Sequence, residues 1–232
     1  YYAMISHIDY RIGQVLEALE RKGMMEDTII VLCGDNGLAI GQHGLMGKQN
    51  IFEHSVKVPL VIAGPGVPED KVSDELVYLM DIYPSLCELC GIDIPDTVES
   101  RSFVPLLHDE KAKIHDYLYL AFQARIRGVM DKRYKLIEYR TDHIRLTQLF
   151  DLKNDPWEQY NLYDMDGTDE IVERLRGELF RLRDEWEDEG ILFGQQFWQQ
   201  WRQYEAAEVH GVASPKGANM AAQVSDWGTN KK

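Results

Sequence analysis

The chain has 232 residues, of which 44% are hydrophobic and 10% aromatic, and it carries a formal charge of −14 at neutral pH. That much apolar material is enough for a sizeable core in one or two domains, which excludes a disordered or fibrous chain. The negative charge argues against a protein that binds nucleic acid or an anionic membrane through its overall field. An anionic ligand would therefore have to be held by a few placed groups.

The first residues and the cysteines leave the cellular compartment open. Apolar residues recur at helical spacing from Ile5 to Leu19, so we expect the chain to begin inside a helix. No signal peptide or membrane span is recognisable, but such a segment could precede residue 1, and periplasmic, secreted and cytoplasmic locations all stay open. Three cysteines make no disulfide framework, and Cys87 and Cys90 lack the second pair of a zinc site. Both are expected to be core thiols.

The first half of the chain alternates helix and strand, which is typical of a layered α/β domain. After the opening helix, the β-branched run 29–33 predicts a strand buried on both faces, as in a helix-covered parallel sheet. A second such strand is predicted at 59–63. The mostly apolar run 76–90 then predicts a helix that Pro84 kinks or restarts.

The pattern changes after about residue 112. Four short strand-like runs separated by turn residues predict a small antiparallel sheet. Between Asp169 and Glu189, apolar residues three or four apart predict an amphipathic helix that covers one face of this sheet. After Gly190 no clear periodicity remains, and we expect an extension that wraps the body or stays mobile. The strand-like runs are 117–122, 126–130, 134–139 and 146–152.

A glycine-flanked turn directly after the first predicted strand is the most informative segment. Ligands of open α/β sheets bind beyond the carboxyl ends of strands, where Asp35 and Asn36 are expected. A carboxylate beside an amide oxygen offers two hard ligands of the kind that calcium or magnesium prefers, although such a cation needs about six oxygens. The alternative is a tight turn in which both side chains cap their own backbone.

Two basic side chains follow in the same glycine-rich loop. His43 and Lys48 are expected to return towards the same edge of the predicted sheet. Beside an anionic substrate, a lysine can neutralise oxygens that gain charge in the transition state, and a histidine can donate a proton to a leaving group. Taken singly, such residues are more often a loop hydrogen bonder and a solvated charge. Only their combination favours a site.

Ordered short motifs give the chain a family resemblance. Up to about residue 110 they closely resemble the C-terminal half of type I sulfatases, which belong to the alkaline-phosphatase-like superfamily. A weaker match over 149–162 resembles the small C-terminal domain of the same enzymes. The motifs include Gly34-Asp35-Asn36-Gly37, His43-Gly44, Gly47-Lys48, Val58-Pro59-Leu60, Gly64-Pro65-Gly66 and Asp81-Ile82-Tyr83-Pro84.

The resemblance implies roles for four residues. Asp35 and Asn36 match an Asp-Asn or Asp-His pair that helps to hold an active-site calcium, with magnesium also possible. Lys48 matches a lysine that contacts the substrate sulfate. His43 lies in a recurrent His-Gly step and is carried over as a pocket residue. The resemblance thus assigns the metal to Asp35 and Asn36, and the catalytic positions to Lys48 and His43.

The resemblance also implies an α/β fold with defined domain boundaries. Residues 1–112 are expected to be the C-terminal portion of the large α/β sulfatase domain, and 113–190 a small antiparallel sheet packed with a C-terminal helix. An extension over 191–232 completes the chain.

Three acidic residues that match the family pattern, Glu53, Asp81 and Asp155, are interpreted as loop and cap residues.

The nucleophile of that family is not in this chain. It is a formylglycine made from Cys or Ser in a Cys/Ser-x-Pro-x-Arg signature, and no such pentapeptide follows Cys33, Cys87 or Cys90 or occurs elsewhere. The resemblance therefore implies that a missing N-terminal half supplies formylglycine and the remaining metal ligands, and that this segment alone is inactive. Without that half, apolar strand edges are expected to be exposed and prone to association.

The predicted function is hydrolysis of sulfate esters by the complete enzyme, acting on a sulfated small molecule or glycan. One alternative is a phosphodiester or phosphonate monoester hydrolase of the same superfamily. Another is a non-catalytic fragment that binds a glycan or a partner protein.

Two further groups of side chains bear on the substrate. An extended anion could contact strand arginines, although such arginines are usually solvated. The aromatic residues of the last segment are expected to pack it down rather than to stack on sugar rings. The arginines are Arg125, Arg127, Arg140 and Arg145, and the aromatic residues are Trp198, Trp201 and Tyr204.

Overall fold

The computed structural model describes residues 1–209, with side chains as far as residue 206, and divides into two compact units. The predicted extension beyond residue 209 lies outside the described residues. None of the helices described combines the length and the apolar character needed to cross a membrane. Unit 1 comprises residues 1–34, 59–74 and 78–114, and unit 2 comprises 35–58, 75–77 and the chain from 115 onwards.

Unit 1 contains three α-helices and one pair of strands among its described elements. These are α1 (Tyr2–Arg21), β1 (Ile30–Cys33), β4 (Leu60–Ala63), α3 (Ile82–Leu89) and α4 (Val104–His108), with short 3-10 helices η1 (Met25–Asp27) and η3 (Leu79–Asp81).

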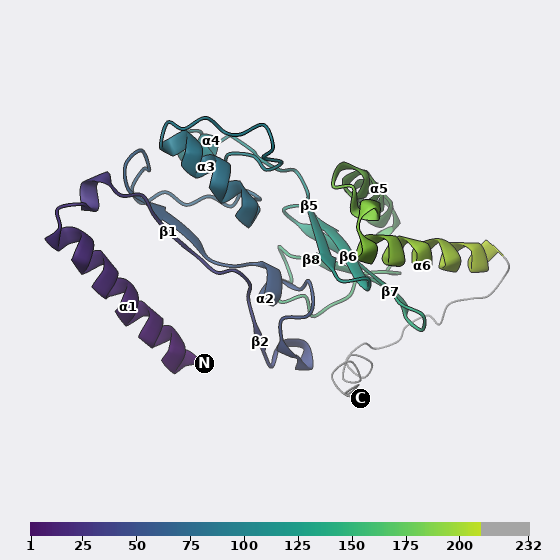
Figure 1. Cartoon of the computed structure of the whole chain (residues 1–232). Helices are drawn as coiled ribbons and strands as arrows, with labels where there is room; N and C mark the ends of the chain where they lie inside the picture. The colour runs from purple at the N-terminus through teal and green to yellow at the C-terminus, as the bar shows by residue number, and fades with distance from the viewer. Residues whose placement is uncertain (210–232) are drawn as a thin grey trace. The chain divides into compact units, whose positions relative to one another are not determined.

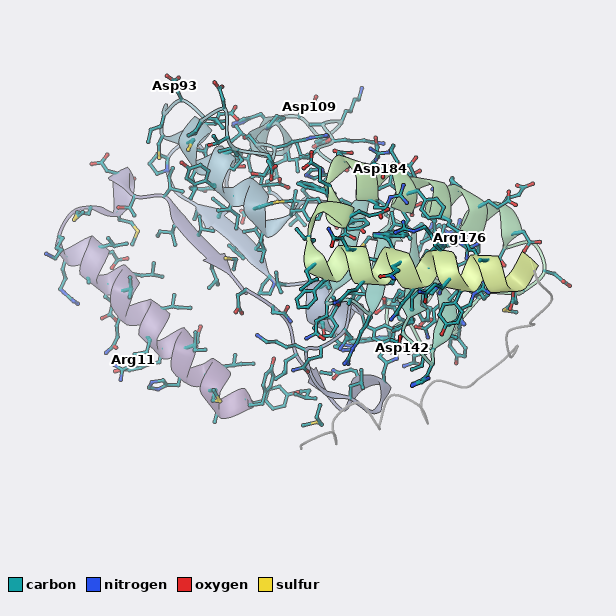
Figure 2. All side chains as sticks on the ribbon, turned by 45° about the vertical axis from the view of Figure 1, so that its right-hand side comes forward. Arg11, Asp93, Asp109, Asp142, Arg176 and Asp184 are labelled. Atoms are coloured by element: carbon teal, nitrogen blue, oxygen red, sulfur yellow. The ribbon has the colours of Figure 1, made fainter. Side chains whose placement is uncertain are left out.

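Helix α1 confirms the predicted opening helix, and Gly23 just beyond it has the left-handed φ of 63° that ends such a helix. None of its residues is buried, and Ile8 on its apolar side is 55% exposed. Figure 1 draws α1 as a helix standing apart from β1, and in Figure 2 the side chains along it, Arg11 among them, project freely. The apolar face of α1 is therefore uncovered in the described part of the chain.

Strands β1 and β4 form where the sequence predicts them, but they pair with each other antiparallel, with Ile30 opposite Ala63 and Cys33 opposite Leu60. The expectation of strands buried on both faces of a parallel sheet was wrong for this pair. Leu32 is 44% exposed and Val61 is 55% exposed. A continuous β-branched run indicates a strand, but strand direction depends on pairing partners that the run does not encode.

The predicted helix over 76–90 is shorter in the structure. It consists of η3 and α3, and Pro84 lies in the first turn of α3, where a missing N–H breaks no helical hydrogen bond. Asp81 is a cap residue as predicted, because its carboxylate accepts hydrogen bonds from the N–H of Tyr78 at 2.7 Å and of Arg101 at 3.1 Å. Cys87 is buried as expected, whereas Cys90, beyond the end of α3, is exposed and is not a core thiol.

Unit 2 contains a four-stranded antiparallel sheet in the order β5-β6-β7-β8, which confirms the predicted small sheet. Its strands are β5 (Leu118–Phe122), β6 (Ile126–Met130), β7 (Tyr134–Arg140) and β8 (Arg145–Asp151). The other elements are β2 (Ala39–Ile40), η2 (Gln42–Gly44), β3 (Met46–Gly47), α2 (Glu53–Val56), α5 (Asp169–Glu185), η4 (Asp188–Gly190) and α6 (Leu192–Val209).

One face of the sheet is covered by helices (Figure 1). Helix α5 is the predicted amphipathic helix, and it packs its Leu residues against β6 and β7. Helix α6 lies where the sequence analysis expected an extension without clear periodicity. Its buried aromatic residues Phe197 and Trp198 lie four and three positions before Trp201, and they pack with it against α5 and the sheet. Together α5 and α6 enclose the helix-side core: Val129, Leu136, Leu149, Val172, Leu175, Leu179, Leu182, Phe197, Trp198 and Trp201. Packing of the tryptophans is thus confirmed.

The opposite face of the sheet is covered by an irregular segment rather than by a helix layer. Ile51 and Phe52, which precede α2, pack onto the sheet residues that alternate with those facing the helices. This loop-side core consists of Ile51, Phe52, Ile126, Ile137, Tyr139 and Phe150. The segment that carries the predicted site is therefore docked on the small sheet.

Two of the strand arginines are buried in ion pairs rather than solvated. Arg127 is buried and its guanidinium pairs with Asp188 at 2.7 Å. Arg140 is buried and pairs with Glu138 at 2.9 Å, with its guanidinium carbon 4.2 Å from the ring centroid of Trp201. The expectation of solvated arginines was wrong for these two. Arg127 meets Asp188 from a distant part of the chain, and Arg140 pairs with Glu138 on its own strand while Trp201 covers its guanidinium.

Candidate active site

The Asp35–Asn36 turn lies at the start of unit 2 and is exposed. Gly37 holds it in place, since its N–H donates to the carbonyl of Ser55 at 2.8 Å. A Cβ at Gly37 would lie 2.1 Å from the carbonyl oxygen of His54, so only glycine allows this close approach. The glycine after the turn is thus required by the packing of the turn against α2.

The donor atoms of this turn fit part of a site for a hard cation. The amide nitrogen of Asn36 donates to the carbonyl of Gly37 at 2.9 Å, which orients its side chain and leaves its oxygen to accept. With the carboxylate of Asp35, this makes two oxygen ligands of the type that calcium prefers. Residues 1–209 contain no group of three or more His, Cys, Asp or Glu side chains that could hold a metal ion. Further ligands would have to come from elsewhere.

A short hairpin returns the chain from Asn36 towards Lys48. Strands β2 and β3 pair with Ala39 opposite Gly47, so Lys48 follows directly on the residue opposite Ala39. Gly47 has a φ of 136°, a backbone conformation that side-chain-bearing residues rarely adopt. Lys48 is exposed, and among the residues described its one hydrogen bond is from the backbone N–H to Gln49 Oε1 at 3.1 Å. The hairpin thus leaves the ammonium of Lys48 available to an anion.

His43 is half-buried and held by two contacts. Its Nε2 lies 3.0 Å from the carbonyl oxygen of Trp157, and its ring stacks on Phe52 with centroids 4.2 Å apart. A carbonyl oxygen only accepts, so in this contact Nε2 carries the proton and Nδ1 is the acceptor. Burial lowers the pKa of His43, against the raising effect of the bond to Trp157. The ring is therefore neutral at pH 7, which favours accepting over donating at Nδ1.

His54 is a second ring in this cluster, and sequence reasoning passed over it. Its centroid lies 5.6 Å from that of His43. Burial, followed by repulsion from His43 and Lys135, lowers the pKa of His54 to about 4. Its Nε2 is buried without a hydrogen-bond partner in the described residues. His54 is thus a neutral, partly desolvated imidazole at physiological pH.

A buried ionic network connects the site segment to the sheet. No local sequence pattern predicts this network, because its residues are far apart in the chain. The Lys135 ammonium donates to Glu53 Oε1 at 2.6 Å, to Glu158 Oε1 at 2.8 Å and to the Ile51 carbonyl at 3.2 Å. Glu158 also accepts from the N–H of Glu53 at 2.6 Å. Burial raises the pKa of Glu158, and Lys135 acts in the opposite direction. Glu53 is accordingly structural, as is Asp155, which accepts from the N–H of Tyr160 at 2.8 Å.

Comparison of the chain with protein-family models identifies its family. Residues 41–185, more than half of the chain, match the model of the C-terminal region of N-sulphoglucosamine sulphohydrolase. The chain belongs to the type I sulfatase family. The matched region of this sulfatase chain includes His43 and Lys48, and it begins after Asp35 and Asn36.

Individual relatives of the sulfatase chain agree with this assignment. An endo-4-O-sulfatase of Bacteroides thetaiotaomicron is 32% identical over 219 residues, which cover 83% of this chain and 43% of the relative. A solved protein in complex with its substrate D-glucosamine-2-N,6-O-disulfate has a TM-score of 0.73 at 25% identity, covering 81% of this chain and 40% of its own.

Another solved structure carries a different activity. A phosphonate monoester hydrolase of Agrobacterium radiobacter has a TM-score of 0.69 at 26% identity, covering 80% of this chain and 40% of its own. The sulfatase chain spans about two fifths of the length of these three proteins.

Proposed function

We propose that the complete protein is a sulfatase that hydrolyses sulfate esters, and that this chain supplies two metal ligands and a sulfate-contacting lysine. The observation that carries the proposal is the family match together with the presence of Asp35, Asn36 and Lys48 on one glycine-bounded loop. The relatives named above support a sulfate ester as the substrate.

Each residue of the loop has a distinct role in this proposal. Asp35 and Asn36 hold a calcium ion, or magnesium, through their side-chain oxygens. When bound, such a cation stabilises negative charge on the ester oxygens. The exposed ammonium of Lys48 neutralises sulfuryl oxygens that gain charge during the attack on sulfur.

His43 acts as a pocket residue rather than as an acid. Its proton is held on Nε2 by the Trp157 carbonyl, so Nδ1 can accept a hydrogen bond from a substrate hydroxyl or from water. Donation to a leaving group would require the doubly protonated ring, which the lowered pKa of His43 disfavours at neutral pH.

The nucleophile and the other ligands belong, in this proposal, to an N-terminal half of the same enzyme. This half contributes the formylglycine, and the present segment has no activity without it. The uncovered apolar face of α1 supports such a partner, because isolated soluble domains seldom leave so many large apolar side chains on one helix exposed.

The substrate class that we propose is a sulfated glycan or a sulfated small molecule. One structural neighbour binds a disulfated glucosamine, and one relative is an endo-4-O-sulfatase. The similarity to a phosphonate monoester hydrolase favours a second candidate, hydrolysis of phosphonate monoesters or phosphodiesters by the same loop. A fragment that only binds a glycan or partner protein is the third candidate.

One assay separates these candidates. The complete protein is given matched aryl esters of sulfate, phosphonate and phosphate, with calcium or with a chelator. A sulfatase shows its largest kcat/KM on the sulfate ester and loses it on chelation. Preference for the phosphonate would select the second candidate, and no turnover of any ester, in a protein that carries the Cys/Ser-x-Pro-x-Arg signature, would contradict both.

A further inference from the structure

The turn formed by residues 155–158 touches the site segment at two separate points. The carbonyl of Trp157 accepts from His43 in the hairpin before Lys48. The carboxylate of Glu158 accepts from the N–H of Glu53, which lies after Lys48. The two contacts therefore bracket Lys48, five residues before it and five residues after it.

The ammonium of Lys135 joins the second contact and uses all three of its hydrogen-bond donors there. An ammonium has three donors, and here they reach the side chains of Glu53 and Glu158 and the carbonyl of Ile51. The Lys135 side chain is 0% exposed, and that of Glu158 is 1% exposed. Charge pairs so far from water are screened little, so their geometry is tightly defined.

The backbone at both contacts is held in an uncommon conformation. His43 has a φ of 53° and Glu158 a φ of 55°, in the left-handed region that residues other than glycine seldom adopt. Such conformations persist where surrounding contacts over-determine them, and they gather at functional sites. Backbone strain is thus located at His43 and Glu158, the residues next to or at the two contacts between the turn and the hairpin segment.

The helix-covered face of the small sheet has a buried carboxylate of its own. A comparable buried carboxylate, Asp188, accepts from Arg127, Trp198 and Tyr119 on the helix-covered face. It makes none of the contacts to residues 41–53 that Glu158 makes. Asp188 is 4% exposed and Glu158 is 2% exposed, which makes the two carboxylates a matched pair for substitution.

We propose that Lys135, Glu158 and the Trp157 carbonyl form a clamp that positions Lys48 and His43, so that Lys135 and Glu158 are positioning residues for turnover. This inference rests on the proposed function for its catalytic consequence. Lys135 lies in β7, and its three acceptors come from the segment after Lys48 and from the 155–158 turn. The clamp therefore holds the loop in a fixed position relative to the sheet. A site held in this way keeps its geometry without substrate, which is what electrostatic stabilisation requires.

The test uses the complete protein and three variants: Glu158→Ala, Glu158→Gln and the control Asp188→Ala. Kinetics on an aryl sulfate are measured at a temperature at which circular dichroism shows each protein folded. Glu158→Ala should lower kcat/KM about 10²-fold, mainly through kcat, because a small misplacement of a positioned group costs that much. Glu158→Gln retains an oxygen for the Glu53 N–H and should recover part of the loss. Asp188→Ala should stay within about twofold of wild type, well short of a tenfold (1.4 kcal/mol) difference.

Hydrogen exchange on the same proteins provides a readout that does not depend on activity. Amides of residues 41–53 should exchange about tenfold faster in Glu158→Ala, and those of 118–130 should not, because only the clamped loop is released. Unchanged exchange in 41–53 would overturn the clamp whatever the kinetics. An equal loss of kcat/KM in Asp188→Ala would overturn the positioning role. A wild type that turns over no ester would refute the proposed function instead, and exchange alone would then decide whether the clamp orders the loop.

Discussion

The two units of this chain differ in how they bury apolar surface. In unit 2, one sheet is covered on both faces, and both buried hydrophobic clusters found among residues 1–209 lie there. In unit 1, α1 buries no residue, and β1 and β4 form an antiparallel pair with large side chains exposed. Unit 2 thus has the features of a self-sufficient domain, whereas unit 1 leaves large apolar side chains exposed, which is what the proposed N-terminal half would cover.

The largest effect is expected in the core of unit 2. Leu149→Ala removes a fully buried side chain between the sheet and α5, and should lower the free energy of unfolding by about 2–5 kcal/mol. Urea unfolding followed by tryptophan fluorescence measures this, since Trp198 and Trp201 lie in the same cluster. A loss below about 1 kcal/mol would mean that unit 2 is less tightly packed than the comparison assumes.

The next effect concerns turnover. Because Lys48 stands exposed on a loop that unit 2 holds rigidly, Lys48→Ala in the complete protein should lower kcat on an aryl sulfate by about 10²–10³-fold. The control is Lys57→Ala, an exposed lysine just after α2. Unchanged kinetics for Lys48→Ala would remove its assignment to the sulfate.

A smaller effect, on the stability of the folded chain, is expected when the pH is lowered. Because burial lowers the pKa of His54 to about 4, the unfolded chain binds a proton at this residue more readily than the folded chain between pH 6.5 and pH 4. Its contribution to stability is therefore present above about pH 6.5 and is lost as the pH falls towards 4. The unfolding midpoint in urea should fall between pH 7 and pH 5, and fall less in His54→Gln. Parallel pH profiles for the two proteins would contradict this.

The stabilisation of the 232-residue chain by calcium should be smaller than the effect of acid. With only Asp35 and Asn36 as ligands, calcium at a concentration equal to its Kd adds about 0.4 kcal/mol of stability, and we expect that Kd to be millimolar or weaker. Calorimetric titration with calcium, with Asp35→Ala as the control, measures it. Micromolar binding abolished by Asp35→Ala would show that the chain supplies a complete site.

An effect as small as that of calcium is expected at α1 of the 232-residue chain. Ile8→Ala changes an exposed side chain and should alter the free energy of unfolding of the 232-residue chain by less than about 0.5 kcal/mol. The same substitution in the complete protein should cost more than 1 kcal/mol if another part covers α1, as proposed. Equal, small effects in both proteins would mean that the contrast between the two units persists in the complete protein.

Some of the candidate site follows from the sequence alone. The glycine-flanked pair Asp35–Asn36 and the loop to Lys48 are local features, and the structure returns the loop through the β2–β3 hairpin. The role of Glu158 is different in kind. It meets Glu53 across 105 positions and Lys135 across 23, and no short window of sequence joins them. The tautomer of His43 likewise depends on a carbonyl 114 positions away.

The sequence by itself determined the four strands of the small sheet, helix α5 and the glycines of the site loop, because periodicity and turn chemistry act over a few neighbouring residues. Its ordered short motifs indicated the family by resemblance, and the family comparison shows it. Only the tertiary structure decided the antiparallel pairing of β1 with β4, the burial of Arg127 and Arg140, and the helix that carries Trp198. Each of these depends on which distant groups share a face or a strand edge. Hydrogen bonding and desolvation are properties of that spatial neighbourhood, and it exists only once the chain has folded.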